Sequence, residues 1–254
     1  MAVIAVFNQK GGVGKTTTCL NVTAALSIAQ QSPIALDLDP QGHLTLASGI
    51  KDVRAEMSMV AFFKHKTPLA GLLRDTSRGW QAIPAALELA KLDAMLGSNP
   101  QAATMLKNGL REDLALTGAP IMIDCCPMLG VLTLNALLAA DRVLVPVSAD
   151  FLSLQGVHRL DSALNVLEVK LKRKIERRIL VTRFDSRRKL SFEIYDKLKS
   201  RFGDQVCETR ISETVALATS PMYGKDVFEY APKSPGAADY QALTRELWDS
   251  GFFA

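Results

Sequence analysis

The sequence predicts an α/β fold with a doubly wound, mostly parallel sheet flanked by helices. Short apolar runs rich in β-branched residues alternate with longer stretches of helical periodicity. Buried parallel strands have this continuous apolar character, and a helix between successive strands provides the right-handed crossover that such a sheet requires. A glycine-rich loop follows the first apolar run, where a sheet of this kind places its ligands.

Strand and helix candidates alternate through most of the chain. Apolar runs predict strands at 3–7, 34–38, 121–123, 143–147 and 179–182. Helical spacing of apolar residues predicts helices at 17–29, 87–95, 105–116, 132–139, 157–171 and 192–201. Residues 48–80 show the least pattern, and we expect them to be an excursion from a single domain that spans 1–254.

The last stretch of the chain, 240–253, places Leu243, Leu247 and Trp248 on one helical face. An amphipathic helix that binds a membrane carries lysines or arginines beside its apolar face. Here the single basic residue, Arg245, is offset by acidic neighbours. The sequence therefore predicts a helix packed on the protein body and no stable membrane association.

The net charge of +4 is unevenly distributed along the chain. Residues 170–189 contain ten basic and two acidic residues, a local charge of +8, so the remainder carries −4. Such a segment indicates a surface that faces a polyanion. The alternative is an ordinary solvated helix end, as in KLKRKIERR.

Composition excludes several classes of protein. No run of eighteen apolar residues is present, and no basic region precedes the strand-like start of the chain, so neither a membrane span nor a signal peptide is expected. The four cysteines include no CxxC pair. Reduced thiols in a cytoplasmic protein are the simplest interpretation.

The stretch NQKGGVGKTT has the composition and the position of a phosphate-binding loop. Its glycines allow backbone N–H groups to turn toward one anion, and the following helix adds its positive end. Lys15 can reach the β- and γ-phosphates of a nucleotide, and the Thr16 hydroxyl can ligate Mg²⁺. A dinucleotide-binding GxGxxG motif cannot be placed, because Gly14 is followed by Lys15 and Thr16. The predicted phosphate-binding residues are Gly11, Gly12, Val13, Gly14, Lys15 and Thr16. A second lysine, Lys10, is more than this chemistry needs, and Gln9 stands where a glycine is usual.

Carboxylates follow two of the predicted strands. ALDLDPQG provides Asp37 and Asp39, and IMIDCCP provides Asp124 in a Walker B pattern. A single aspartate after a strand is commonly a helix cap or a turn former. Three of them beside a phosphate loop favour the handling of a metal ion and a water molecule.

These motifs together resemble the ParA/MinD family of P-loop ATPases, whose deviant Walker A motif contains the extra lysine of KGGVGKTT. The similarity continues through DLDPQG, IMIDCCPMLGVLTLNAL, LVPVSADFLSLQGVHRL, DSRRKLS and YGKDVFEYAPKSPGAADYQAL, and so covers nearly the whole chain. The chain is most similar to the short Soj-like members, which lack an N-terminal DNA-binding extension. The resemblance implies a P-loop NTPase fold of the deviant Walker A type.

The resemblance also implies catalytic roles for Lys10, Lys15 and Asp39. Lys10 would cross a two-fold homodimer that forms on ATP binding and contact the partner's phosphates, and a residue other than glycine at Gln9 would be normal. The alternative for Lys10 is a solvent-facing lysine that acts only by long-range attraction. Asp39 would orient the attacking water.

The implied cofactors are ATP and Mg²⁺. Thr16 would bind the metal directly, while Asp37 and Asp124 would hold its water ligands. Thr17 would lie at the α-phosphate, and the adenine would lie near Thr182, Arg183 and the region of Ile211.

Three departures from the family pattern are evident. Cys126 replaces a proline after the Walker B aspartate, and His43 stands where asparagine is common. The segment ISETVALATSP lacks the basic residues with which Soj-like members bind DNA, so Ser212, Glu213 and Ala216 put DNA binding in question. The 170–189 segment could compensate, and its candidate DNA-binding residues are Lys172, Arg173, Arg187, Arg188 and Lys189.

The implied function is an ATPase switch that dimerises with ATP, binds DNA without sequence preference in the cytoplasm at the nucleoid, and segregates a plasmid or chromosome through a ParB-like or other activating adaptor. Positioning of a protein cluster is an alternative cargo. Membrane cycling as in MinD is a second alternative, and it requires the basic amphipathic tail that this chain lacks. Metal-cluster chemistry is a third, and it requires cysteines at the dimer axis or a CxxC pair.

Overall fold

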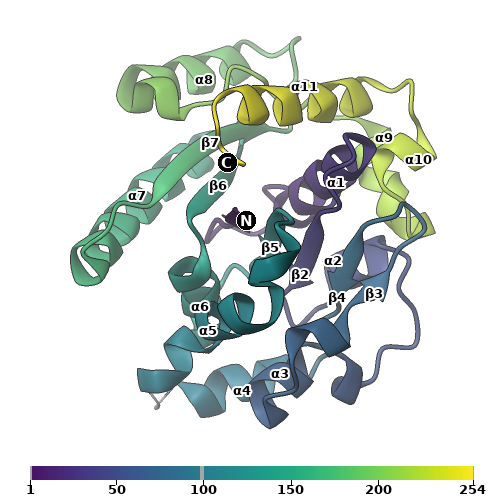
Figure 1. Cartoon of the computed structure of the whole chain (residues 1–254). Coiled ribbons are helices and arrows are strands. Elements are labelled where there is room, and N and C mark those ends of the chain that lie inside the picture. Colours follow the sequence, from purple (N-terminus) through teal and green to yellow (C-terminus); the bar gives the residue numbers. More distant parts are fainter. Residues whose placement is uncertain (1, 98–99, 254) are drawn as a thin grey trace.

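The computed structural model describes residues 2–97 and 100–253, and within them seven strands form one sheet between layers of helices (Figure 1). The strand order is β3-β4-β2-β5-β1-β6-β7, and of the pairs only β3–β4 is antiparallel in this described part. The strands are β1 (Val3–Val6), β2 (Ile34–Asp37), β3 (Arg74–Asp75), β4 (Gln81–Ile83), β5 (Ile121–Asp124), β6 (Arg142–Ser148) and β7 (Glu176–Thr182).

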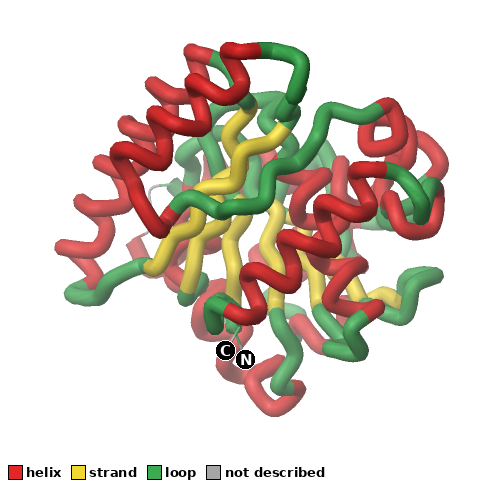
Figure 2. The backbone as a smooth tube through the Cα atoms, turned by 90° about the horizontal axis from the view of Figure 1, so that it is seen from above, coloured by secondary structure: helices red, strands yellow, loops and turns green. Residues whose placement is uncertain are grey.

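Helices cover both faces of the sheet, as Figure 2 shows from above. Side chains alternate along β1, so that Val3 and Ala5 join one apolar core while Ile4 and Val6 join the other. Helices α3 to α8 contribute to the first core, and α1, α2, α9, α10 and α11 contribute to the second. The helices are α1 (Lys15–Ile28), α2 (His43–Ala47), α3 (Met59–His65), α4 (Leu89–Leu96), α5 (Met105–Gly109), α6 (Val131–Ala139), α7 (Phe151–Leu171), α8 (Lys189–Phe202), α9 (Val215–Thr219), α10 (Val227–Tyr230) and α11 (Pro235–Asp249).

The predicted doubly wound α/β fold is confirmed, and each of the five predicted strands is present within one or a few residues of its expected limits. Helix α7 begins at Phe151 and not at 157. Asp150 caps it, since the Asp150 carboxylate accepts a 2.9 Å hydrogen bond from the Ser153 amide. This cap, and not the apolar spacing, determines where α7 starts.

The stretch predicted to be helical at 105–116 is helical, but it is not one regular α-helix. Helix α5 ends at Gly109 and is followed by a π-helical turn at Leu110–Leu114 and a 3₁₀ turn at Ala115–Thr117. A Cβ on Gly109 would lie 2.5 Å from the ring of Phe62, so the backbone packs there as only glycine allows. The widened turn contains Asp113, whose carboxylate accepts a 2.7 Å hydrogen bond from the Leu69 amide.

Residues 48–80 are more ordered than their sequence predicts. They contain α3 and the edge strand β3, which pairs with β4. Residues 59–63 of α3 are all buried, so the helix shows no polar face, and strands of two or three residues are too short to show a period. Both signals were therefore absent from the sequence pattern.

Helix α11 packs on the protein body as predicted. Leu243 and Leu247 are fully buried, and the Tyr240 and Thr18 hydroxyls are 3.1 Å apart, which joins α11 to α1. Trp248 differs from the prediction because its side chain remains 45% exposed. Among the described residues, no helix combines the length and the hydropathy needed to span a bilayer.

The packing of α11 predicts the effect of truncating its buried face. Leu243→Ala should lower the free energy of unfolding by roughly 2–5 kcal/mol, because it removes a fully buried side chain and leaves a cavity. Gln241→Ala, on the exposed side of the same helix, is the control and should change stability by less than about 0.5 kcal/mol. Urea denaturation followed by circular dichroism measures both, and equal effects would contradict the docking of α11.

Candidate nucleotide-binding site

The loop between β1 and α1 forms an open cradle of backbone amides. Gly12 and Gly14 have φ values of 72° and 83°, in the left-handed region that favours glycine. A Cβ on Gly11 or Gly12 would meet no other atom within 4 Å, so the backbone borders open space. Helix α1 begins at Lys15 directly after the loop. Its free N–H groups and positive end make this space favourable for an anion.

Lys15 is the buried cation of the cradle. Its side chain is 8% exposed, and its ammonium donates a 2.9 Å hydrogen bond to the Lys10 carbonyl oxygen. Burial lowers the pKa of Lys15, while the nearby carboxylate of Asp124 opposes that shift. A phosphate in the cradle would offer this ammonium charged acceptors in place of one neutral carbonyl.

Two carboxylates lie side by side at the ends of adjacent strands. Asp37 on β2 is in register with Asp124 on β5, and both are buried. Burial raises the pKa of Asp37 to about 6, although hydrogen bonds from Thr45 and from the Asp39 amide oppose the shift. Burial and the charge of Asp37 raise the pKa of Asp124 well above its usual range. A cation bound here would relieve this repulsion.

The donor set at these carboxylates suits Mg²⁺. The Thr16 hydroxyl donates a 2.7 Å hydrogen bond to Asp124 Oδ2, whereas Asp124 Oδ1 is buried and has no hydrogen-bond partner among the described residues. Within 2–97 and 100–253, no three His, Cys, Asp or Glu side chains are arranged to hold a metal directly. Mg²⁺ prefers oxygen ligands and keeps several waters, so one hydroxyl and two carboxylates that hold waters fit it.

Asp39 borders the same space from the loop after β2. Its carboxylate accepts a 2.9 Å hydrogen bond from the Gln41 amide, and its side chain remains only slightly exposed. His43 begins α2 and also lines the cavity.

A cavity of about 990 Å³ extends from the glycine loop past Asp39. It is large enough for a nucleotide and mostly apolar beyond the loop. Thr17, Thr182, Arg183 and Ile211 all line it, so the residues predicted to surround a nucleotide are brought together.

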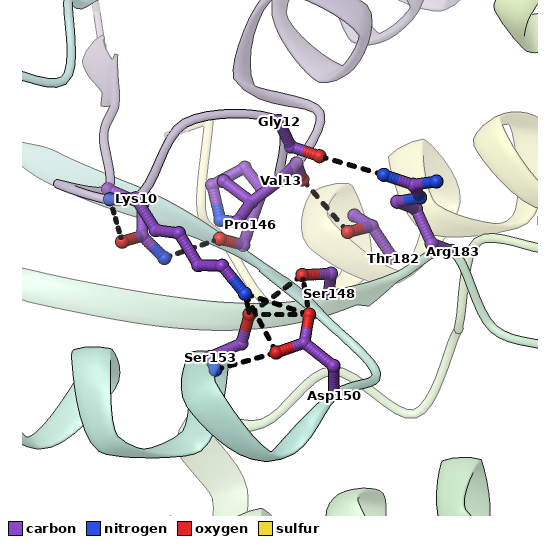
Figure 3. Close-up of polar contacts among 10 residues, drawn as sticks. Lys10, Gly12, Val13, Pro146, Ser148, Asp150, Ser153, Thr182 and Arg183 are labelled. Atoms are coloured by element: carbon purple, nitrogen blue, oxygen red, sulfur yellow. Dashed lines mark hydrogen bonds and ion pairs between the residues drawn. The ribbon is translucent and has the colours of Figure 1, made fainter.

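Thr182 and Arg183 lie against the glycine loop (Figure 3). The Thr182 hydroxyl donates to the Val13 carbonyl oxygen at 2.9 Å, and Arg183 reaches the Gly12 carbonyl oxygen at 3.5 Å. Arg183 also pairs with Glu213, at 2.7 Å and 3.0 Å. Glu213 belongs to the segment that departs from the family pattern, and sequence reasoning did not anticipate this pairing.

The Lys10 side chain points away from the glycine loop, toward the start of α7 (Figure 3). Its ammonium lies 2.7 Å and 2.9 Å from the two carboxylate oxygens of Asp150 and 2.9 Å from the Ser153 hydroxyl. Sequence reasoning missed these partners. The available signal was the S-A-D-x-x-S pattern after β6, which combines a helix cap with two hydroxyls.

The basic segment 170–189 does not form one surface, contrary to the expectation that it could act as a unit. Arg177 is nearly buried and pairs with Asp161 and Glu168. Arg178 donates to the Asp204 carbonyl oxygen at 2.6 Å, and Arg173 donates to the Ala140 carbonyl oxygen at 2.6 Å. These guanidinium groups are used to hold the fold together.

The most exposed arginines of the segment lie just before α8, while Lys172 and Lys174 are exposed between α7 and β7. Arg187 and Arg188 both contact Asp185, with side chains 87% and 68% exposed. Lys189, at the first residue of α8, is 3.6 Å from Glu193 and almost fully exposed. Lys172 ends α7 at a φ of 51°. The side chain of Lys170 lies outside the described part of the structure.

This combination of a glycine loop at a helix N-terminus and paired carboxylates at neighbouring strand ends defines a P-loop nucleotide-binding protein. A family model described as an AAA domain matches residues 1–177. The chain is 39% identical to the chromosome-partitioning ATPase Soj of Thermus thermophilus over 248 residues, which cover 96% of this chain and 94% of that protein. It is 36% identical to the chromosome partitioning protein ParA of Myxococcus xanthus over 247 residues, with coverage of 96% and 87%. The chain belongs to the ParA/MinD family of P-loop ATPases.

A solved structure gives a further comparison. The cobyrinic acid a,c-diamide synthase of Mycobacterium smegmatis, with bound ADP and magnesium, superposes with a TM-score of 0.84. The two sequences are 31% identical, and the match covers 99% of this chain and 96% of that one. The P-loop fold is therefore shared along nearly the full length.

The loop conformation predicts different effects for two adjacent glycines. Gly12→Ala should lower the free energy of unfolding of the nucleotide-free protein by about 1–2 kcal/mol, because alanine is strained at a φ of 72°. Gly11→Ala is the matched control, since its Cβ meets nothing and its φ is not left-handed. Urea denaturation of both variants tests the conformation, and equal stability would contradict it.

Proposed function

We propose that this protein is a Mg²⁺-dependent ATPase switch, with residues 1–254 acting as one domain, that dimerises with ATP and positions a cargo on DNA. The single observation that carries the proposal is the cradle itself. A buried lysine and a helix N-terminus face an open cavity, beside a buried carboxylate oxygen that has no partner among the described residues. A nucleoside triphosphate with its metal supplies both the anion and the cation that this arrangement favours.

The P-loop residues would hold the triphosphate of ATP. The amides of Gly11, Gly12, Val13 and Gly14 surround the cradle, and Thr17 would lie at the α-phosphate. Lys15 would exchange the Lys10 carbonyl for the β- and γ-phosphates. Thr182 and Arg183 would contact the adenine, at the end of the cavity that also contains Ile211.

The acidic residues would hold Mg²⁺ and prepare water for attack. Thr16 would ligate the metal, and Asp37 and Asp124 would hold its water ligands. When bound, Mg²⁺ neutralises phosphate charge in the transition state. Asp39 would accept a hydrogen bond from the attacking water and orient it toward the γ-phosphate.

Lys10 would act in the partner protomer's site. A cation delivered across a dimer to phosphate oxygens forms charge-assisted hydrogen bonds, and comparable fingers accelerate phosphoryl transfer by about 10³–10⁵. Its ammonium already lies outside its own cradle, which supports a role beyond that protomer. The homodimer would then depend on ATP, because ADP lacks the γ-phosphate.

DNA would bind to the exposed cations near α8. Arg187, Arg188 and Lys189 supply this charge, Lys172 contributes at the end of α7, and two copies in a dimer double it. Arg173 was a further candidate, but its carbonyl partners favour a structural role. Phosphate contacts of this kind carry no sequence preference.

The relatives named for chromosome partitioning support a DNA cargo. We further propose that a ParB-like or other activating adaptor brings this cargo and that the protein acts in the cytoplasm at the nucleoid. Positioning of a protein cluster is the second candidate. It is favoured by the contacts of the altered segment ISETVALATSP with other parts of the protein. Glu213 pairs with Arg183, and the Ser212 amide donates to Asp239. A membrane-cycling role is disfavoured, since the apolar face of α11 is buried.

Two lysine substitutions test the ATPase switch. Lys15→Ala should weaken ATP binding by roughly 100-fold or more, because it removes charge-assisted hydrogen bonds to phosphate. Lys10→Ala should bind ATP with little change and remain monomeric. Isothermal titration calorimetry measures the first effect and multi-angle light scattering with ATP measures the second.

Each lysine variant serves as the control for the other, since both remove one positive charge from the same loop. Full ATP affinity in Lys15→Ala would contradict the phosphate assignment. A normal ATP dimer in Lys10→Ala would contradict the role of Lys10 in trans.

Charge reversal tests the DNA surface. The double variant Arg187→Glu with Arg188→Glu should weaken binding to any duplex in the presence of ATP. The slope of log affinity against log salt should become shallower by about 0.9 for each DNA phosphate that the variant no longer neutralises. Lys64→Glu with Lys66→Glu, exposed at the end of α3, changes the net charge equally and should leave binding unchanged. Electrophoretic mobility shifts over a series of salt concentrations measure the affinity of both double variants for DNA. If both variants bind DNA equally weakly, the net charge alone is responsible and the DNA surface is wrongly assigned.

A further inference from the structure

The ammonium of Lys10 is satisfied within its own protomer. It contacts both oxygens of the Asp150 carboxylate and the hydroxyl of Ser153 at 2.7–2.9 Å. Three acceptors complete the hydrogen-bonding capacity of an ammonium group. In this arrangement Lys10 has no donor left for a phosphate, although it is the lysine that distinguishes the loop.

Asp150 is held firmly in the position that receives Lys10. It caps α7 by accepting from the Ser153 amide, and the Ser148 hydroxyl donates to it at 2.6 Å from the end of β6. Burial raises the pKa of Asp150, but the hydrogen bonds from Lys10, Ser148 and Ser153 outweigh it, so the net pKa lies well below the usual range. Asp150 is therefore an anion whose position the fold determines independently of Lys10.

The backbone of Lys10 is fixed as well. Its amide donates to the Asn8 side chain, whose own amide donates to the Pro146 carbonyl oxygen on β6. Its carbonyl accepts from Lys15. Both lysines of the loop thus donate to acceptors within the protein. The Lys15 ammonium, which would have to bind ATP instead, donates to the backbone carbonyl oxygen of Lys10.

We propose that Asp150 is a positioning residue that locks Lys10 onto its own protomer and so sets a threshold for ATP-dependent dimerisation. The proposal rests on the proposed role of Lys10 in trans. A partner's triphosphate, with several anionic oxygens, competes with one carboxylate and one hydroxyl. We call this ion pair between Lys10 and Asp150 the lock. It keeps the Lys10 ammonium from binding weaker anions, and it breaks only when a partner protomer with bound ATP is present.

The expected size of the threshold follows from the exposure of the pair. The Lys10 and Asp150 side chains are 33% and 43% exposed, so solvent screens their attraction. Ion pairs of this exposure shift an equilibrium by roughly 1.5- to 5-fold. Two of these ion pairs open for each dimer, so removal of both should lower the dimer dissociation constant by roughly 2- to 25-fold.

The variant Asp150→Asn removes the ion pair with Lys10 but keeps the helix cap. Asparagine caps helices about as well as aspartate but carries no charge for Lys10. The dissociation constant of the dimer with a slowly hydrolysed ATP analogue and Mg²⁺ is measured by sedimentation of the full-length protein. Asp150→Asn should dimerise more tightly than wild type, and Ser153→Ala should shift in the same direction by less. Glu176→Gln, which removes an equal charge from the ion pair with Arg142 on β6, is the control and should match wild type.

A second measurement uses the nucleotide-free protein. The free energy of unfolding of Lys10→Gln, Asp150→Asn and the double variant gives a double-mutant cycle. The lock predicts that the two substitutions are coupled, so that the double variant is no less stable than either single variant. Additive effects would show that the pair does not interact in solution, and they would overturn the proposal.

The outcomes are distinguishable from failure of the proposed function. If wild type does not dimerise with the ATP analogue, the proposed switch fails and the lock fails with it. If wild type dimerises but Asp150→Asn dimerises equally or more weakly, the lock alone is overturned. Weaker dimers with an intact coupling in the cycle would mean that Asp150 holds Lys10 ready for the partner.

Discussion

The fold places two carboxylates side by side in the protein interior, at the carboxyl ends of the sheet strands. Because β2 and β5 are adjacent and parallel, their ends bring Asp37 and Asp124 into register in the protein interior. Burial disfavours both charged forms, and the neighbouring lysine only partly offsets the cost. A site of this kind is incomplete without a cation and an anion. The same strand order that makes the fold therefore also makes a site for a metal with phosphates.

The glycine loop is held from the opposite side by β6 and β7. Asn8 binds the Pro146 carbonyl oxygen on β6, and Thr182 at the end of β7 binds the Val13 carbonyl oxygen. Lys10 continues this anchoring through Asp150 at the start of α7. Asp37 and Asp124 thus come from β2 and β5 on one side of β1, while the contacts that hold the loop come from β6, β7 and the start of α7 on the other side. Lys10 and Asp150 thus join the loop directly to the start of α7.

Sequence reasoning predicted the parts of the site that depend on local motifs and strand order. Asp37 and Asp124 end neighbouring parallel strands, and Lys15 and Thr16 begin the helix after the first strand, so the packing of the sheet brings them together. The partners of Lys10 could not be predicted in this way, because Asp150 is 140 residues away and its pairing depends on where α7 begins. Strands β3 and β4 and helix α3 were missed for a different reason, since the strands are only two or three residues long and residues 59–63 of α3 are all buried, so neither shows a period.

The 170–189 segment shows why a count of basic residues overestimates the positive charge that a surface exposes. Its arginines differ in their neighbours, and a guanidinium group is well suited to bind carbonyl and carboxylate oxygens within a fold. Arg173, Arg177 and Arg178 are used in this way, so their charge is partly neutralised or directed inward. Exposed arginines gather where β7 leads into α8, beside the segment that contains Glu213, while Lys172 and Lys174 remain exposed between α7 and β7. Because Glu213 is paired with Arg183, its negative charge is largely offset before it could repel a polyanion. In the proposed DNA-binding state, the altered segment would add neither attraction nor a comparable repulsion, and the exposed cations of the 170–189 segment would supply the electrostatic contribution to binding.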